Sequence, residues 1–463
     1  MRGTESQYLY QPKCSIDKNS IFADYIIIRY MEKKLYPLKF IPIASKRPWG
    51  GNALVKDLKK VFVVCDDEGN ETVLGTDELI GESWEIADMG FEDSVVSDGW
   101  LAGNTIGELM ETYLERIVGE DVYNYYGRQF PLLIKFLDIK GKLSVQVHPD
   151  DEIAAERYDS LGKNEIWYVL DAEPGSKIYA GFNKDMTAQE LYDRCHDGSI
   201  EEVLNVIHPK KGDVLHITPG TVHAAEGGLL IAEIQESSDM TFRLYDWGRE
   251  FNPETARTMH LEDAIDFIDY RKFDESNYCG CSCHGENHKC HCHDDEHECG
   301  CGSDHHHDEE KVMETYVESP QFNVSKLKLA DPLHIYTDRF GSFIIYVCIE
   351  GAASVQVPSV NEAGEACMDN YELGKGETIL IPADMPDFYL VPRDKPTFLL
   401  EAVTRPDKEL DNYIDPDTEA FLEDEDYEGL EDGAFDDDDE DMPQAPAGAS
   451  PLGFFGSGRG PLS

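Results

Sequence analysis

The chain has 463 residues, 41% hydrophobic and 10% aromatic, which is enough to bury the cores of two or three domains. Its formal net charge of −53 argues against a nucleic-acid partner, because phosphates need a basic face to bind. The sequence contains no secretory signal and no apolar run of about eighteen residues, so we expect a cytoplasmic protein without a membrane partner.

Residues 1–35 are predicted to form an N-terminal extension, because they show no sustained hydrophobic period. The stretch "MEKKLYPLKFIPI" from Met31 is typical of a natural start. Whether translation begins at Met1 or at Met31 stays open.

Residues 36–270 are predicted to form the first domain, built mostly from short strands between Gly, Pro and Asp turns. "KLSVQVH", "NEIWYVL", "DVLHIT", "LLIAEIQE" and "TFRLYDW" have strand-like composition. Apolar residues at helical spacing predict helical patches over 106–118 and, in two pieces, over 188–207. Many strands with few helices favour a barrel or a double-sheet jelly roll.

Residues 271–312 are predicted to be an insert rich in cysteine and histidine. Between Cys279 and His307 lie seven of the chain's twelve cysteines and eight of its fifteen histidines. In a reducing cytoplasm such thiols are metal ligands or free thiols rather than disulfides, and the CxC spacing is not that of a zinc finger. The segment could bind zinc, nickel or copper, act as a regulatory metal switch, or be a plain polar linker.

Residues 313–405 are predicted to form a second β-domain, a degenerate copy of the first. "LGKGETILIPADMPDF" repeats the pattern of "PKKGDVLHITPGTVHA", but without a histidine at the position of His223. The second domain is therefore expected to be chemically silent. The predicted fold class is mainly β, with two β-domains of one architecture, each a barrel or a double-sheet jelly roll, and a few accessory helices.

Residues 406–463 are predicted to be an acidic, disordered tail. From Asp407 to Asp441 there are nineteen acidic residues and one lysine, a net charge of −18. Such a segment has few groups able to bury surface. The alternative is a docking site for a basic partner.

Four residues of the first domain predict a metal site. In "LSVQVHPDD", strand alternation puts Leu143 and both valines on one face, and Gln146 and His148 with Ser144 on the other. Glu165 opens the next strand and His223 follows a tight turn. Two imidazoles, a carboxylate and an amide oxygen suit Zn²⁺ or a similar divalent ion. The alternative is a set of hydrogen-bonded core polar groups.

The motifs "KRPWGG" (46–51), "GESWEIAD" (81–88), "LSVQVHPDD", "GKNEIWYVL", "DAEPGSKIYAGF", "PGTVHA" and "TFRLYDWGR" resemble the type I mannose-6-phosphate isomerases, in their compact bacterial form. The resemblance covers about residues 36–405. It implies the cupin fold, a zinc ion, and conversion of D-mannose 6-phosphate to D-fructose 6-phosphate through a cis-enediol. It also implies a place in mannose metabolism or GDP-mannose biosynthesis.

Position by position, the resemblance implies that Gln146, His148, Glu165 and His223 bind the metal. It implies catalytic roles for Arg243, Lys163 and Glu233 and a pocket position for Ser144. Trp49 could form a wall of the sugar site, with packing in the core as the alternative. Moving a proton between two carbons needs a base with a pKa near neutral, an electrophile and a phosphate anchor. Glu233, Lys163 or a metal-polarised water could be the base, and the choice stays open.

Arg249 is the candidate phosphate anchor, because guanidinium groups pair with phosphate through two hydrogen bonds. The alternative for Arg249 is an ion pair with Glu250. His216 is predicted to be a core histidine, and Asp150 and Asp151 a turn and helix cap.

Two other functions compete. One is a different cupin activity, such as another sugar-phosphate isomerase, and the other is a non-enzymatic metal buffer in which the Cys/His insert is the working part. The intact site in the first domain argues against the buffer. The sequence leaves monomer and homodimer open.

Overall fold

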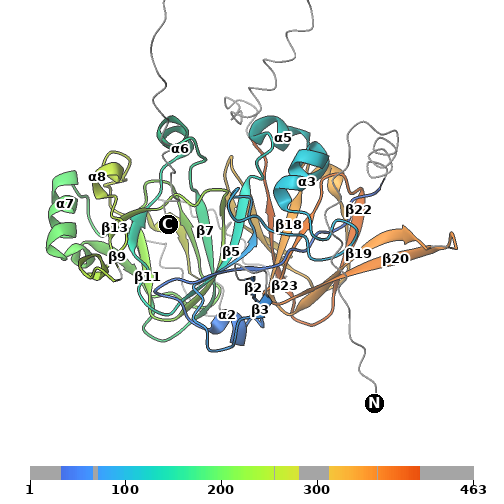
Figure 1. Cartoon of the computed structure of the whole chain (residues 1–463), viewed down its shortest axis with the longest axis horizontal. Coiled ribbons are helices and arrows are strands. Elements are labelled where there is room, and N and C mark those ends of the chain that lie inside the picture. Colours follow the sequence, from blue (N-terminus) through green and yellow to red (C-terminus); the bar gives the residue numbers. More distant parts are fainter. Residues whose placement is uncertain (1–32, 66–70, 255, 281–311, 362, 407–463) are drawn as a thin grey trace, which may run out of the picture. The chain divides into compact units, whose positions relative to one another are not determined.

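The computed structural model describes residues 33–65, 71–254, 256–280, 312–361 and 363–406 (Figure 1). The chain divides into two compact units, Met1–Tyr36 and Pro37–Ser463, and the elements below all belong to the second. Most of the predicted N-terminal extension, most of the Cys/His insert and the acidic tail lie outside the described residues.

The described chain is mainly β with few helices, which confirms that part of the prediction (Figure 1). The α-helices are α2 (Ala53–Lys56), α3 (Ile106–Tyr113), α4 (Glu115–Val118), α5 (Glu120–Tyr126), α6 (Asp151–Tyr158), α7 (Ala188–Asp197) and α8 (Leu261–Ala264). Short 3₁₀ turns are η1 (Ile200–Glu202), η2 (Arg249–Phe251), η3 (Glu275–Asn277) and η5 (Thr337–Arg339). Among the described residues, every helix is too short or too polar to cross a bilayer.

The first half consists of a seven-stranded and a five-stranded sheet, both antiparallel. The larger sheet runs β1 (Ile43–Ser45), β4 (Glu82–Ile86), β5 (Leu132–Ile139), β12 (Leu229–Glu236), β7 (Glu165–Ala172), β10 (Val214–Ile217), β14 (Tyr278–Cys279). The smaller runs β13 (Phe242–Tyr245), β6 (Val145–Val147), β11 (His223–Glu226), β8 (Lys177–Phe182), β9 (Leu204–Ile207). A separate ribbon joins β2 (Val63–Cys65) to β3 (Glu71–Val73).

The main core of the first half lies between these two sheets. One apolar cluster combines Leu137, Trp167 and Ile217 of the larger sheet with Ile178 and Ala225 of the smaller one. A second cluster lies on the other side of the smaller sheet, where Val145 and Val147 pack with residues of α7 and α8. The polar positions of β6 therefore face the space between the sheets.

The second half repeats this layout. One sheet runs β15 (Met313–Glu318), β16 (Asn323–Lys328), β23 (Phe398–Val403), β18 (Ile344–Glu350), β21 (Thr378–Ile381), and the other runs β17 (Leu333–Tyr336), β22 (Asp387–Pro392), β19 (Ala352–Val360), β20 (Ala366–Gly374). Ile344, Ile379 and Leu399 of the first pack against Val355 and Phe388 of the second. The space that holds polar groups in the first half is thus filled by an apolar core here.

Both predicted helical patches contain helices, but neither is continuous. α3 begins with a capping box between Thr105 and Glu108, and the patch breaks where Leu114 has a φ of 47°. The second patch has two helical pieces, as predicted: α7 ends at Asp197, since Gly198 closes it in the left-handed region, and the 3₁₀ turn η1 follows. Its last four residues were predicted to be helical but form β9, where Ile207 pairs with Ile178 of β8.

Candidate metal and substrate site

Three buried side chains from the two sheets of the first half meet in one cluster. His148 directly follows β6, Glu165 opens β7 and His223 opens β11. Their ligand atoms all lie within 4.8 Å of one another, and no other such His, Cys, Asp and Glu group occurs in the part of the chain that is described. Glu165 lies 3.3 Å from His223 Nε2 and 3.8 Å from His148 Nε2, through its two different oxygens.

The second nitrogen of each imidazole faces a backbone carbonyl. His148 Nδ1 lies 2.7 Å from the oxygen of Met240, and His223 Nδ1 lies 2.9 Å from that of Thr221. A carbonyl can only accept, so Nδ1 carries the proton and Nε2 presents a lone pair. His148 Nε2 and Glu165 Oε1 are buried without a hydrogen-bond partner. Two such atoms facing one point are the arrangement that a metal ion satisfies.

The protonation state of the imidazoles suits a metal as well. Burial lowers the pKa of His223 to about 4, and burial with the nearby Lys163 lowers the pKa of His148 well below its ordinary range. Both rings are therefore neutral at neutral pH, as metal ligands must be.

Gln146 and Ser144 lie beside this cluster. The register of β6 puts Gln146 opposite His223 on one side and opposite Arg243 on the other. Its amide nitrogen is 3.3 Å from His223 Nε2, and Ser144 Oγ donates to its amide oxygen at 3.1 Å. Leu143 departs from the predicted alternation, because it precedes β6 and packs between the sheets rather than beside the valines.

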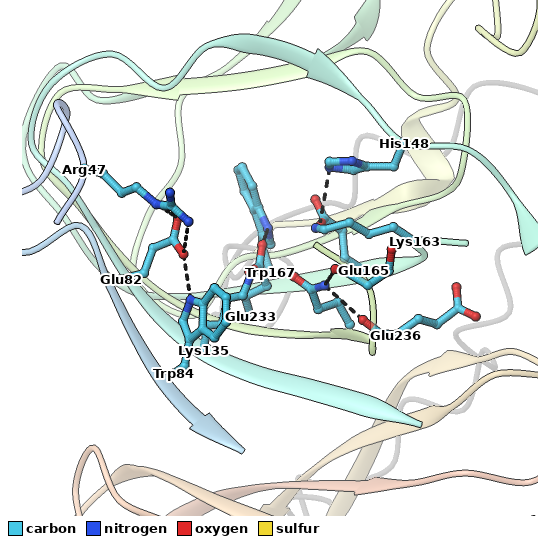
Figure 2. A network of polar contacts seen from close by, with 12 residues as sticks. Arg47, Glu82, Trp84, Lys135, His148, Lys163, Glu165, Trp167, Glu233 and Glu236 are labelled. Atoms are coloured by element: carbon cyan, nitrogen blue, oxygen red, sulfur yellow. Dashed lines mark hydrogen bonds and ion pairs between the residues drawn. The ribbon is translucent and has the colours of Figure 1, made fainter. Parts of the chain in front are cut away.

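Lys163 and Glu233 lie on the wall next to the cluster (Figure 2). Lys163 donates to Glu165 Oε2, while Glu233 accepts from Trp167 Nε1 at 2.8 Å and lies 3.6 Å from Lys135 Nζ. Burial raises the pKa of Glu233 despite both lysines. Burial opposes the charge of Lys163, but Glu165 and Glu233 outweigh it and raise its pKa.

Arg243 closes another side of the site. It is 5% exposed, and its Nη1 donates to the oxygen of Thr258 at 2.8 Å, while its Nε has no partner. Burial and the neighbouring Arg257 lower its pKa to about 10, so the guanidinium stays charged at neutral pH. A charged group with an unused donor can bind a substrate oxygen.

A cavity beside the cluster connects these groups. Its lining includes, among the described residues, five cations and three carboxylates: Arg47, Lys135, Lys163, Arg243, Arg257, Glu82, Glu233 and Asp239. Trp49, Gln146, Trp167 and His260 complete its polar and aromatic walls. In a chain with a net charge of −53, a cavity with more cations than anions is suited to an anionic ligand.

Comparison with known proteins agrees with this site. A family model described as "Phosphomannose isomerase type I, catalytic domain" matches residues 38–197. Mannose-6-phosphate isomerase ManA of Bacillus subtilis is 30% identical over 355 residues, which cover 76% of this chain and 95% of that protein. This chain belongs to the type I phosphomannose isomerase family.

Two further likenesses extend the assignment. The mannose-6-phosphate isomerase of Streptococcus mutans is 36% identical over 223 residues, 48% of this chain and 65% of that protein. The crystal structure of the mannose 6-phosphate isomerase from Bacillus subtilis is 27% identical, with a TM-score of 0.59, and the match covers 80% of this chain and 99% of that one. The predicted family and fold class are confirmed, and the chain is an isomerase enzyme.

Two arginines beside the cavity, Arg249 and Arg257, share one carboxylate, and the sequence analysis singled out only Arg249. Arg249 donates to Asp246 at 2.6 Å, and Arg257 donates to both oxygens of the same carboxylate at 2.5 and 3.0 Å. Arg257 lines the cavity, whereas Arg249 does not. The role predicted for Arg249 stays a prediction.

Several cavity residues escaped sequence reasoning. Lys135 stands in the all-buried strand β5, and Arg257 lies fourteen residues beyond Arg243 in a segment without regular structure. Arg47 stands inside the "KRPWGG" motif, one place before Pro48, and donates to Glu82 at 2.8 Å. Lys135 in the largely apolar strand β5, which also contains Asp138, was an available signal, because burying a charge demands a use for it.

Proposed function

We propose that this enzyme interconverts D-mannose 6-phosphate and D-fructose 6-phosphate through a cis-enediol, with Zn²⁺ as its metal. The observation that carries the proposal is the buried trio His148, Glu165 and His223, beside a cavity whose lining includes Glu233, Lys163 and Arg243. We further propose a cytoplasmic location and a part in mannose metabolism and GDP-mannose supply.

The residues present fit a zinc ion. His148, Glu165 and His223 would supply three ligands, and Gln146 would be a fourth only after its amide turned, because its oxygen now accepts from Ser144. Two neutral imidazoles with one carboxylate are typical of catalytic zinc sites that keep a position open. A zinc ion there would supply Lewis-acid chemistry, polarising and orienting the sugar oxygens without redox change.

Glu233 is the group best suited to move the proton between C2 and C1. Its pKa is raised by burial toward the neutral range that a general base needs, whereas the pKa of Lys163 is raised away from that range. Trp167 Nε1 holds one oxygen of Glu233, which fixes the carboxylate toward the cavity. Lys163 and Arg243, both cationic, would stabilise the negative charge of the enediolate.

The phosphate would bind at the cationic rim of the cavity. The side chain of Arg257 is 18% exposed and that of Arg47 is 23% exposed, whereas Arg243 is buried. A phosphate dianion keeps part of its hydration at such a rim, and guanidinium groups offer it paired donors. Arg249 would support Arg257 through their shared partner, Asp246.

Substituting Arg257→Met should raise KM for mannose 6-phosphate on the order of 10- to 100-fold, the cost of one charged hydrogen-bonding partner. The change in kcat should be smaller, because the phosphate is bound equally in the ground and transition states. Steady-state kinetics test this, with Arg271→Met as the control, since Arg271 is 84% exposed and pairs with Asp269. An unchanged KM in the Arg257 variant would remove it from the phosphate site.

The direct test of the function is fructose 6-phosphate formation from mannose 6-phosphate by the purified, zinc-loaded protein. We expect turnover that a chelator abolishes and that added Zn²⁺ restores. Glucose 6-phosphate serves as the competing substrate, because another sugar-phosphate isomerase would prefer it. Absence of turnover with mannose 6-phosphate would reject the proposal.

A second arm of the same assay addresses the Cys/His segment, which we propose binds additional metal ions. Deleting residues 281–307 spares β14, whose Tyr278 and Cys279 pair with β10. We expect kcat to stay unchanged at saturating zinc, while the number of zinc ions bound per chain falls. Loss of activity at saturating zinc would assign the segment a part in catalysis, and an unchanged zinc content would make it a plain linker.

A further inference from the structure

Residues 162–164 form the last part of the connection from α6 to β7 and are called the turn here. The turn contains Lys163 and leads directly into Glu165, yet no sheet holds its backbone N–H groups. Each is bound by a different partner: Gly162 by Asp151 Oδ1 at 2.9 Å, Lys163 by the oxygen of Pro149 at 3.0 Å, and Asn164 by Glu236 Oε2 at 2.8 Å. A Cβ on Gly162 would lie 2.5 Å from backbone atoms of Asp150 and Asp151, so the turn also packs closely on the start of α6.

The side chain of Asn164 is fixed as well. It is 5% exposed, and its Oδ1 lies 2.8 Å from His216 Nε2, so the predicted core histidine serves as a hydrogen-bonding partner of this turn. Its Nδ2 reaches Gln321 Oε1 at 3.4 Å. Gln321 lies between β15 and β16, and its Nε2 donates to Asp151 Oδ2 at 3.0 Å. One side chain of the second half therefore contacts two groups that fix the turn.

Glu236 is a further side chain that fixes this turn, because it accepts from the backbone of Asn164. It lies three residues beyond Glu233 in β12, so the two carboxylates point to opposite faces of the sheet: Glu233 to the cavity and Glu236 to the turn. Glu236 is 1% exposed, and Figure 2 shows it on the far side of Lys163 and Glu165 from Glu82. Burial and the nearby Asp151 raise its pKa well above the ordinary range.

We propose that Gln321 and Glu236 are positioning residues, which set the turn that aims Lys163 at the cavity and Glu165 at the metal site. The second half, although it carries no metal cluster among the described residues, thereby contributes to the reaction through Gln321. The inference deepens the proposed function and rests on it. Changing a residue that orients a metal ligand without binding the metal typically lowers activity or metal affinity about 10- to 100-fold.

Gln321→Glu tests the proposal with little change of shape. The new carboxylate faces Asp151 and cannot donate to it, so we expect the turn to shift. The expected result is a loss of about 10- to 100-fold in kcat with a smaller change in KM, and a similar loss of zinc affinity measured by chelator competition. Zinc affinity is a readout that does not depend on the substrate.

The rescue combines Gln321→Glu with a second substitution, Asp151→Asn. The amide introduced at position 151 can donate to the new carboxylate and still accept from Gly162, so kcat and zinc affinity should recover toward wild-type values. Lys211→Ala is the matched control, because Lys211 pairs with Glu350 of the second half at 2.7 Å but lies away from the turn. It should leave both quantities unchanged.

The outcomes separate the possible failures. If Gln321→Glu changes neither kcat nor zinc affinity, Gln321 does not position the turn. If it lowers both but the double variant does not restore them, while the melting temperature falls in each, Gln321 supports only folding. If the wild-type protein does not isomerise mannose 6-phosphate, the proposed function fails, and the zinc affinities of the three variants still decide the role of Gln321.

Discussion

Glu165→Gln should abolish zinc binding at the site and lower kcat by more than about 100-fold. About 100-fold is the largest loss expected when a residue that only orients a metal ligand is changed. Glutamine keeps the size of the side chain but removes the only carboxylate of the trio. It also removes the negative charge beside the buried Lys163, which donates to Glu165, and a buried charge that loses its opposite partner is strongly destabilising. Metal analysis after gel filtration and steady-state kinetics with added zinc measure the two effects.

Glu401→Gln is the matched control for this variant. Glu401 is a buried glutamate of the second half that accepts from Tyr346 at 2.7 Å, and an amide oxygen can accept the same bond. We expect unchanged zinc content and unchanged kcat. A Glu165→Gln protein that binds as much zinc as the wild type and keeps normal turnover would show that the catalytic metal lies elsewhere.

The site residues that could be predicted from the sequence are those that lie in short sequence motifs. Gln146 lies within β6, His148 and Glu165 stand at the ends of recognisable strands, and His223 follows a Pro-Gly turn. Polar residues at such places in an apolar strand have few explanations other than use, since burial without a partner is costly. Asp150 caps α6 as predicted, because its side chain accepts from Ile153 at 2.9 Å, a bond within one helical turn.

What sequence could not supply is the pairing of distant segments. Lys135 and Glu233 face each other only because β5 and β12 pair in one register, and a shift of either strand by one residue would turn its own side chain away from the cavity. Gln321 reaches Asp151 across 170 positions of sequence. The helical periodicity near Ile207 was overridden by pairing with β8, because a tertiary partner outweighs local propensity.

Glu233→Gln should lower kcat on the order of 10²- to 10⁴-fold, the usual contribution of a general base. Glutamine keeps the bond from Trp167 Nε1, so the fold of the strand should be retained. The base must be deprotonated, and burial raises the pKa of Glu233 above its ordinary value of 4.5. In the wild type, kcat/KM should therefore fall as the pH drops through that raised pKa, and this limb should be missing in the variant.

Glu233→Asp separates loss of the carboxylate from loss of packing. Aspartate is shorter and should reduce kcat, yet it can still titrate, so a limb at acid pH should remain. All profiles are measured at saturating zinc, because protonation of His148 and His223 would otherwise release the metal and produce a limb of its own. If Glu233→Gln retains both the wild-type kcat and the acid limb, the proton is moved by another group, and Lys163, already on the cavity wall, is the next to be replaced.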